Sequence, residues 1–240
     1  MTRSQSRPAD ARPWHGPPSP TVRQLGNLPI WVLRPPARTP FNCVLVAGPD
    51  GLVLVNTGTD RTCGEALRQK VTDLVDRPVT TVIYPHHPTT NCRGTSGVID
   101  PDSARSGNVV VLAAGRRGGE GFRGVSPNLL VDRECILRLS GVTMRLFPVR
   151  TSGVDGLNVY LPRYRVALLA DEPSMWKRPI GTRVTTPFAR AANWFLRFPV
   201  EHLLGSHMLP LSGPEVHLVL NAYLNRGRRG SGPPVLGEEP

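Results

Sequence analysis

Runs of apolar residues divide the central part of the chain into segments that favour β-strands. Apolar and β-branched residues fill 29–33 and 42–47, and a Pro-Asp-Gly turn then leads into a third run at 52–56. Such runs, bounded by turn residues, are typical of a β-hairpin. The same pattern predicts further strands at 79–84, 108–113, 136–139, 143–148, 157–161 and 166–170.

Helical spacing of apolar residues predicts one helix in the first half of the chain and two near its end. The first follows Thr62-Cys63-Gly64-Glu65, which has the form of a capping box, and its buried face is formed by Leu67, Val71, Leu74 and Val75. A second helix is expected at 188–195. The last follows another box at 212–215, with a buried stripe of Val216, Val219, Leu220 and Tyr223. His202 is also assigned a helical position.

The grouping of these elements favours a layered α/β sandwich, because strands come in two clusters with helices between and after them. Residues 1–22 are rich in Pro, Arg and Ser, and 226–240 are rich in Gly, Pro and Arg. Both segments are expected to be disordered tails. The sequence therefore predicts one domain at 23–225.

The charge of the chain does not by itself indicate a nucleic-acid partner. The formal net charge is +11, but Lys70 and Lys177 are the only lysines among 29 basic residues, and the arginines are scattered. With abundant Gly and Pro, this composition is typical of a GC-rich genome rather than of a nucleic-acid surface. We expect no nucleic-acid partner.

Cysteine usage and hydropathy favour a cytoplasmic protein. The four cysteines form no Cys-x-x-Cys pair, which argues against a cysteine zinc site, and four free thiols suit a reducing compartment. The N-terminus lacks the apolar run of a signal peptide, and no stretch of about 18 apolar residues could span a membrane.

The chemistry of the chain is concentrated where the apolar strand at 79–84 enters a loop. That loop carries His86 and His87 and reaches Gly94. It resembles the zinc loop of metallo-β-lactamase-fold hydrolases, in which a strand ends in His-x-His-x-Asp-His and a glycine follows. Aligned on the strand and the glycine, His86 is the one retained ligand, and the other three positions hold Pro88, Thr90 and Asn91. The resemblance implies a four-layer αβ/βα sandwich with a degenerate metal-binding loop.

Four segments narrow the resemblance to the zinc-dependent alkyl sulfatases of that fold. The segment 51–58 is similar to a Gly-x-x-x-x-Asp-Thr motif, with Asn56 in place of Asp, and 94–113 is similar to the stretch after the zinc loop. The segment 157–171 resembles a Tyr-x-Pro hairpin, and 205–213 resembles a Ser-His-x-x-Pro loop. Together they extend over about 42–225.

The resemblance implies a reduced set of metal ligands. In the family two zincs share one cleft, which requires six or seven converging ligands. Here His86, Asp171 and His207 are retained, so the resemblance implies no cofactor or one divalent metal, with zinc favoured. The alternative is that these three side chains bond to one another in a metal-free pocket. In either case we expect them within about 8 Å of one another in one cleft.

Further pocket residues follow from the same alignment. A family carboxylate falls near Ser152, where Asp155 could substitute, and His87 and Asn91 are expected to line the same pocket. Arg183 lies near a family Arg-Gly segment that contacts the sulfate, and a guanidinium suits an oxyanion.

Two functions remain open from the sequence. One is a small-molecule enzyme of specialised metabolism that performs hydrolysis or acid–base chemistry on an anionic substrate. Its catalytic residues would be His86, His207, Asp171 and Arg183. The other is a non-catalytic relative that binds a ligand or a partner protein. Fold alone does not separate the two.

Overall fold

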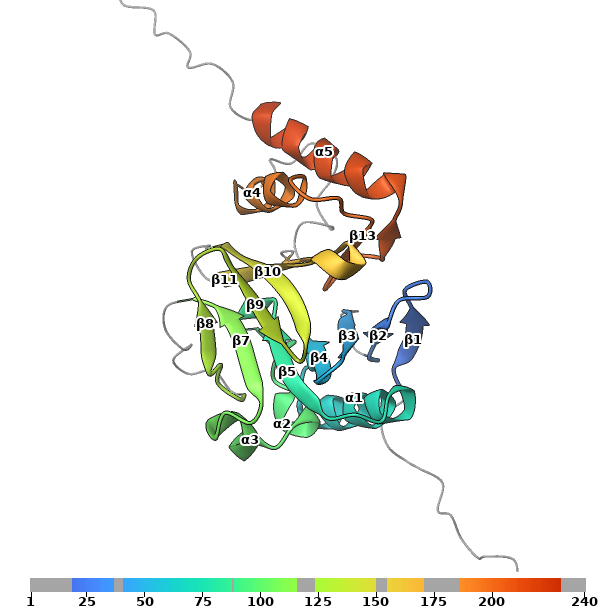
Figure 1. Cartoon of the computed structure of the whole chain (residues 1–240), viewed down its shortest axis with the longest axis vertical. Coiled ribbons are helices and arrows are strands. Elements are labelled where there is room, and N and C mark those ends of the chain that lie inside the picture. The colour runs from blue at the N-terminus through green and yellow to red at the C-terminus, as the bar shows by residue number, and fades with distance from the viewer. Residues whose placement is uncertain are drawn as a thin grey trace, which may run out of the picture.

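Two β-sheets lie face to face, with helices on their outer sides (Figure 1). This computed structural model describes residues 19–36, 41–87, 89–115, 124–149, 155–170 and 186–229. Helices α4 (Thr186–Phe195) and α5 (Pro214–Arg229) cover one sheet, and α1 (Arg61–Leu74), α2 (Thr95–Val98) and α3 (Pro101–Arg105) cover the other. The predicted four-layer αβ/βα sandwich is therefore confirmed.

The first sheet has seven strands in the order β1-β2-β3-β4-β5-β7-β8. It begins with an antiparallel meander, and β4, β5, β7 and β8 are parallel neighbours. The strands are β1 (Thr21–Gln24), β2 (Ile30–Arg34), β3 (Cys43–Gly48), β4 (Gly51–Val55), β5 (Val79–Tyr84), β7 (Val110–Ala114) and β8 (Leu129–Val131).

The second sheet follows the order β14-β13-β12-β11-β10-β9, and the short strand β6 pairs with β11 beside this path. Its strands are antiparallel except at β12 and β13, which run parallel. They are β6 (His86–His87), β9 (Cys135–Leu139), β10 (Val142–Val149), β11 (Asp155–Leu161), β12 (Val166–Leu169), β13 (His202–Gly205) and β14 (Leu211–Ser212). A 3-10 turn, Pro162–Tyr164, joins β11 to β12.

Alternation along the buried strands creates three apolar layers. On β4, Val53 and Val55 face the second sheet, whereas Leu52 and Leu54 face α1–α3, because successive side chains of a strand point to opposite faces. A third layer lies between the second sheet and α4 and α5, and it contains Trp194 and Phe195. No described helix is long and apolar enough to cross a membrane.

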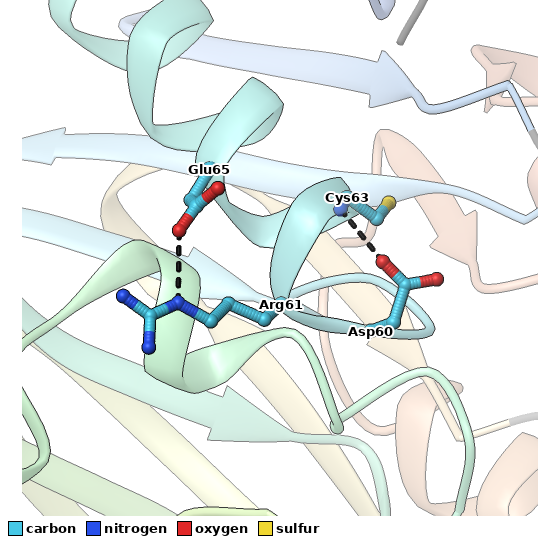
Figure 2. Close-up of polar contacts among 4 residues, drawn as sticks. All are labelled: Asp60, Arg61, Cys63 and Glu65. Atoms are coloured by element: carbon cyan, nitrogen blue, oxygen red, sulfur yellow. Dashed lines mark hydrogen bonds and ion pairs between the residues drawn. The ribbon is translucent and has the colours of Figure 1, made fainter. Parts of the chain in front are cut away.

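The start of α1 differs from the sequence prediction. The N-cap is Asp60, whose carboxylate accepts the backbone N–H of Cys63 at 2.9 Å (Figure 2). Thr62 lies inside the first turn, and Glu65 pairs instead with Arg61 at 2.9 Å. Asp60 prevails because an aspartate with extended backbone is a stronger cap than a threonine already in helical geometry.

The second predicted capping box and the predicted tail boundaries also differ from the structure. The Ser212 hydroxyl bonds His202 Nδ1 at 2.8 Å, and His202 lies on strand β13 rather than in a helix. Strand β1 starts at Thr21 and α5 continues to Arg229, so regular structure extends beyond 23–225 at both ends. Helix α5 passes the predicted boundary because 221–226 continues without a helix breaker.

Candidate functional site

The two loop histidines lie on β6, at the edge of the second sheet. His86 and His87 pair with Gly156 and Asp155 of β11, and both histidine side chains are buried. The His87 ring stacks on Tyr84, with ring centroids 5.6 Å apart. Burial lowers the pKa of His87, and the Asp155 charge opposes that shift. His87 therefore favours the neutral form.

The loop after β6 is closed by its own hydrogen bonds. The carbonyl oxygen of His86 accepts the Thr89 hydroxyl at 3.2 Å and the Cys92 thiol at 3.3 Å. The carbonyl oxygen of Asn91 accepts the backbone N–H groups of Thr57 and Gly58 at 2.9 and 3.1 Å. These contacts fix the backbone around Asn91 without using its side chain.

The glycine that ends the motif allows a close backbone crossing. A Cβ atom on Gly94 would lie 2.1 Å from the carbonyl oxygen of Thr57, and one on Gly64 of α1 would lie 1.9 Å from the carbonyl oxygen of Gly94. Only residues without a side chain fit at this approach. The motif glycine thus packs the loop against the start of α1.

Buried hydroxyl groups connect this loop to the first sheet. The Thr95 hydroxyl lies 2.6 Å from the Tyr84 hydroxyl and 2.8 Å from the Thr57 hydroxyl, and it donates to the carbonyl oxygen of Cys92 at 2.9 Å. Burial raises the pKa of the Tyr84 hydroxyl above its ordinary value, and it raises the pKa of the Cys92 thiol to about 12. Tyr84 and Cys92 are therefore packing and hydrogen-bonding groups at neutral pH.

The loop that carries His207 is held by two buried asparagines that flank strands of the first sheet, Asn42 before β3 and Asn56 after β4. Asn42 Nδ2 donates to the carbonyl oxygens of Gly205 and Met208 at 2.8 and 2.6 Å, and its backbone N–H donates to the carbonyl oxygen of Ser206 at 2.7 Å. Asn56 Nδ2 donates to the Asn42 carbonyl oxygen at 2.8 Å and to the Ser206 hydroxyl at 3.1 Å.

Asn56 has a backbone φ of 61°, in the left-handed region that asparagine tolerates better than most residues. Its amide stands where the family has a carboxylate. A carboxylate could not donate to the Asn42 carbonyl oxygen, whereas an amide does. The departure from the family motif is therefore explained by the hydrogen bonds that this chain makes.

The two loops meet at Asn91 and His207. Asn91 Nδ2 lies 3.4 Å from His207 Nε2, although the residues are 116 positions apart. An amide nitrogen can only donate, so Nε2 accepts in this contact, and the neutral ring then carries its proton on Nδ1. Both side chains are half-buried. At 3.4 Å the contact is long for a hydrogen bond.

The structure describes only some of the predicted site residues. Asn91 and His207 are in contact, and His86, His87 and Asp155 lie together at the β6–β11 pairing. Asp171, Arg183 and Ser152 lie outside the described residues. The convergence of His86, Asp171 and His207 therefore stays a prediction.

The donor set of the described residues does not fit a zinc site. Within that part of the chain, no three His, Cys, Asp or Glu side chains are placed to hold one metal ion. Structural and catalytic zinc need at least three such protein ligands. His207 instead has a neutral amide beside its Nε2, at the position where the family has a histidine. We therefore derive no chemical step through a metal.

The fold defines the class: this is a metallo-β-lactamase-fold chain that resembles alkyl sulfatases. No protein-family profile and no curated protein sequence matches it. Among solved structures, it is similar to the stereoselective inverting sec-alkylsulfatase Pisa1 from Pseudomonas sp., with a TM-score of 0.65 and 20% identity. That match covers 81% of this chain and 40% of the sulfatase, so the chain spans well under half of that enzyme's length.

Metallo-β-lactamases match over nearly their whole length. The enzyme from Pontibacter korlensis has a TM-score of 0.62 and 14% identity, covering 88% of this chain and 99% of its own. The enzyme FIM-1 from Pseudomonas aeruginosa, in its mono-zinc form, has a TM-score of 0.59 and 16% identity, covering 90% and 98%. At these identities the likeness shows the fold alone.

Sequence reasoning missed the residues that hold the site together. Asn42 and Ser206 were not assigned any role, because their partners lie more than a hundred positions away. The only local signal was a polar residue at the end of an apolar run, as Asn42 is before β3. Such residues satisfy the backbone groups that a strand leaves open.

Proposed function

We propose that this chain is a small-molecule enzyme in which His207 transfers a proton to or from an anionic substrate. The observation that carries the proposal is the 3.4 Å contact between Asn91 Nδ2 and His207 Nε2, which joins the loop after β6 to the loop after β13. A half-buried imidazole with a displaceable neighbour has the properties of a general acid or base. Hydrolysis and acid–base chemistry both fit this arrangement.

In such a step, Nε2 of His207 takes a proton from a water or a substrate hydroxyl that displaces the Asn91 amide. The imidazolium then returns the proton to the leaving group. Asn91 acts as a positioning residue, because its amide holds the ring before the substrate enters. Arg183 remains our candidate for the anionic group, since a guanidinium pairs well with an oxyanion.

A second candidate function is supported by a different observation. The loop at 89–94 is closed by backbone and thiol hydrogen bonds, so it keeps its form without serving as a ligand set. This arrangement fits a non-catalytic relative that binds a ligand or a partner protein. In that case the Asn91–His207 contact would be structural.

The test compares His207→Ala with His217→Ala, a matched change at an exposed position of α5. A panel of aryl esters, sulfates, phosphates and lactones is assayed with the purified wild type, with and without a chelator. Any turnover found should fall by about a hundredfold or more in His207→Ala, the usual contribution of acid–base catalysis, and stay unchanged in His217→Ala. Metal analysis of the same protein should find fewer than two zinc ions per chain.

Asn91→Asp distinguishes a catalytic from a structural imidazole. A carboxylate beside the ring raises the histidine pKa, so the acid limb of the pH–rate profile should move to higher pH if His207 is the base. Turnover that is equal in wild type and His207→Ala contradicts the proposal. So does a complete absence of turnover combined with imidazole NMR signals of His207 that no anion shifts, which favours the non-catalytic reading.

A further inference from the structure

An open groove of about 650 Å³ lies in the outer helical layer, against α2, α3 and the segment before β8. Two arginines, two serines and two prolines are among its lining residues: Arg93, Ser96, Pro101, Arg105, Ser126 and Pro127. None of its described lining residues is an Asp or a Glu. Neither His86, Asn91 nor His207 lines it, so the groove is separate from the candidate active site.

Its two arginines are presented differently. The guanidinium of Arg93 is exposed and makes no hydrogen bond or ion pair with the described part of the chain. Arg105 forms an ion pair with Asp102, one turn earlier on α3. The Arg105–Asp102 pair is exposed and therefore weak, so both guanidiniums have donors available to capture an anionic group in pairs.

The walls of the groove are fixed by hydrogen bonds to the backbone, part-buried at Asn128 and buried at Tyr84. Asn128 accepts the Val111 N–H at 2.8 Å and donates to the carbonyl oxygens of Ala104 and Val109 at 2.7 and 2.8 Å. On the other side, the Tyr84 hydroxyl donates to the carbonyl oxygen of Val125 at 2.8 Å. A ligand would therefore enter a site that needs little reordering, which favours binding.

Size and polarity indicate the class of ligand. Pockets for small molecules have volumes of about 300–1,000 Å³ and combine apolar walls with a few polar groups. Here Pro101 and Pro127 offer apolar surface, and the exposed hydroxyl of Ser126 adds a hydrogen-bonding group beside the arginines.

We infer that this groove binds a small organic oxyanion, such as a phosphate, sulfate or carboxylate attached to a ring or a short chain. The inference does not depend on the proposed proton transfer at His207. The anionic group would lie between Arg93 and Arg105, with its apolar part against Pro101 and Pro127.

The test uses isothermal titration with phenyl phosphate and with inorganic phosphate, at constant ionic strength. The double variant Arg93→Ala/Arg105→Ala should bind phenyl phosphate about tenfold more weakly or worse, because charge-assisted hydrogen bonds are lost. The matched control is Arg68→Ala/Arg138→Ala, which removes the same charge at two exposed positions outside the groove. It should bind as the wild type does.

Three further measurements test whether binding occurs at this groove. Arg93→Lys keeps the charge but loses the planar fork, so its affinity should fall between wild type and the double variant. Amide NMR shifts on titration should cluster at Ser96 and 124–128. His207→Ala should retain binding, which separates failure here from failure of the proposed function. Equal affinity in the two double variants, or shifts spread over the surface, would overturn the inference.

Discussion

The two ends of strand β4 are held by different means. At the end that begins with Gly51, the tip of the β9–β10 hairpin contacts the first sheet, and the Ser140 hydroxyl lies 2.7 and 2.8 Å from the Thr80 and Thr81 hydroxyls. At the other end, beyond Val55, the side-chain amides of Asn42 and Asn56 bind the His207 loop. The first end combines hydroxyl contacts with close packing of Gly48 against Ser140, and the other end is held by buried side-chain amides.

The difference separates two ways of holding the end of a strand within one sandwich. The Ser140 end leaves no room for an added atom, as close-packed interiors do. The Asn42 end accepts irregular loops because buried amides satisfy their backbone groups. Convergent side chains such as Asn91 and His207 can therefore be placed there. We expect mutations at the first end to act through packing and those at the second through hydrogen bonds.

The largest effect is expected from Gly48→Ala at the closed end. The new Cβ would lie 2.0 Å from the Ser140 carbonyl oxygen, so the hairpin tip must move. We expect a loss of about 4 kcal/mol in the free energy of unfolding, or failure to fold. Urea denaturation measures it.

Gly107→Ala is the control for backbone strain alone. Its φ is +79°, but the added methyl group meets no atom within 4 Å. It should cost about 1 kcal/mol. Equal losses at Gly48 and Gly107 would show that the closed end is not tightly packed.

Asn42→Ala should have the next largest effect, at the polar end. The change leaves the carbonyl oxygens of Gly205 and Met208 without their Nδ2 donor and takes away the side-chain oxygen that Arg34 bonds at 3.2 Å. A loss of about 3 kcal/mol is expected, since buried polar groups lose their partners. Asn108→Ala, at an exposed position, should change stability by less than about 0.5 kcal/mol. Similar losses of stability in Asn42→Ala and Asn108→Ala would show that the Asn42 amide does not hold this end together.

Asn56→Asp sharpens the comparison, because it changes one donor and keeps the shape. The carboxylate would face the Asn42 carbonyl oxygen, which now receives an N–H at 2.8 Å. We expect a loss of about 2 kcal/mol at neutral pH, recovered in part when the carboxyl is protonated in acid. Denaturation at two pH values measures both. A more stable variant would show that the amide is not required.

The smallest effect concerns the pH dependence that His87 imposes. Burial lowers its pKa in the folded state below the ordinary 6.5, so the unfolded chain binds more protons as the pH falls. Stability should be complete above about pH 6.5 and decrease below it, until the lowered pKa is passed.

Removing the imidazole tests this assignment. His87→Gln should flatten the decrease in urea midpoint between about pH 7.5 and about pH 5.5, whereas His217→Gln, at an exposed position, should not. An unchanged slope in His87→Gln would assign the pH dependence to another group.

Much of the fold was predictable, because long apolar runs indicate buried strands and apolar residues at helical spacing indicate helices. The strands at 79–84 and 136–139 and the helix at 188–195 were placed within a few residues. Strand β6 was not predicted, since two residues carry no period, and His202 was misassigned because β13 has only four.

The site was predictable only at positions that align with the zinc-ligand positions of the resembled family. Asn91 and His207 were both expected to line one pocket, and the structure shows their side chains 3.4 Å apart, whereas the full set of site residues stays a prediction. The bonds of Asn42 and Asn56 to the His207 loop were not foreseen. They join residues 150 to 166 positions apart, and no local sequence pattern predicts such a contact.

The separation between Asn42 and its partners also sets the order in which the protein can be made. Ribosomes release the N-terminal part first, and domains form as their residues emerge. The first sheet is complete by Val131, yet Gly205 and Met208 reach Asn42 only some seventy residues later. Until then the Asn42 amide has to be satisfied by water. The His207 loop is thus assembled last, and a nascent chain stopped before β13 carries a finished sheet without the loop that Asn42 binds.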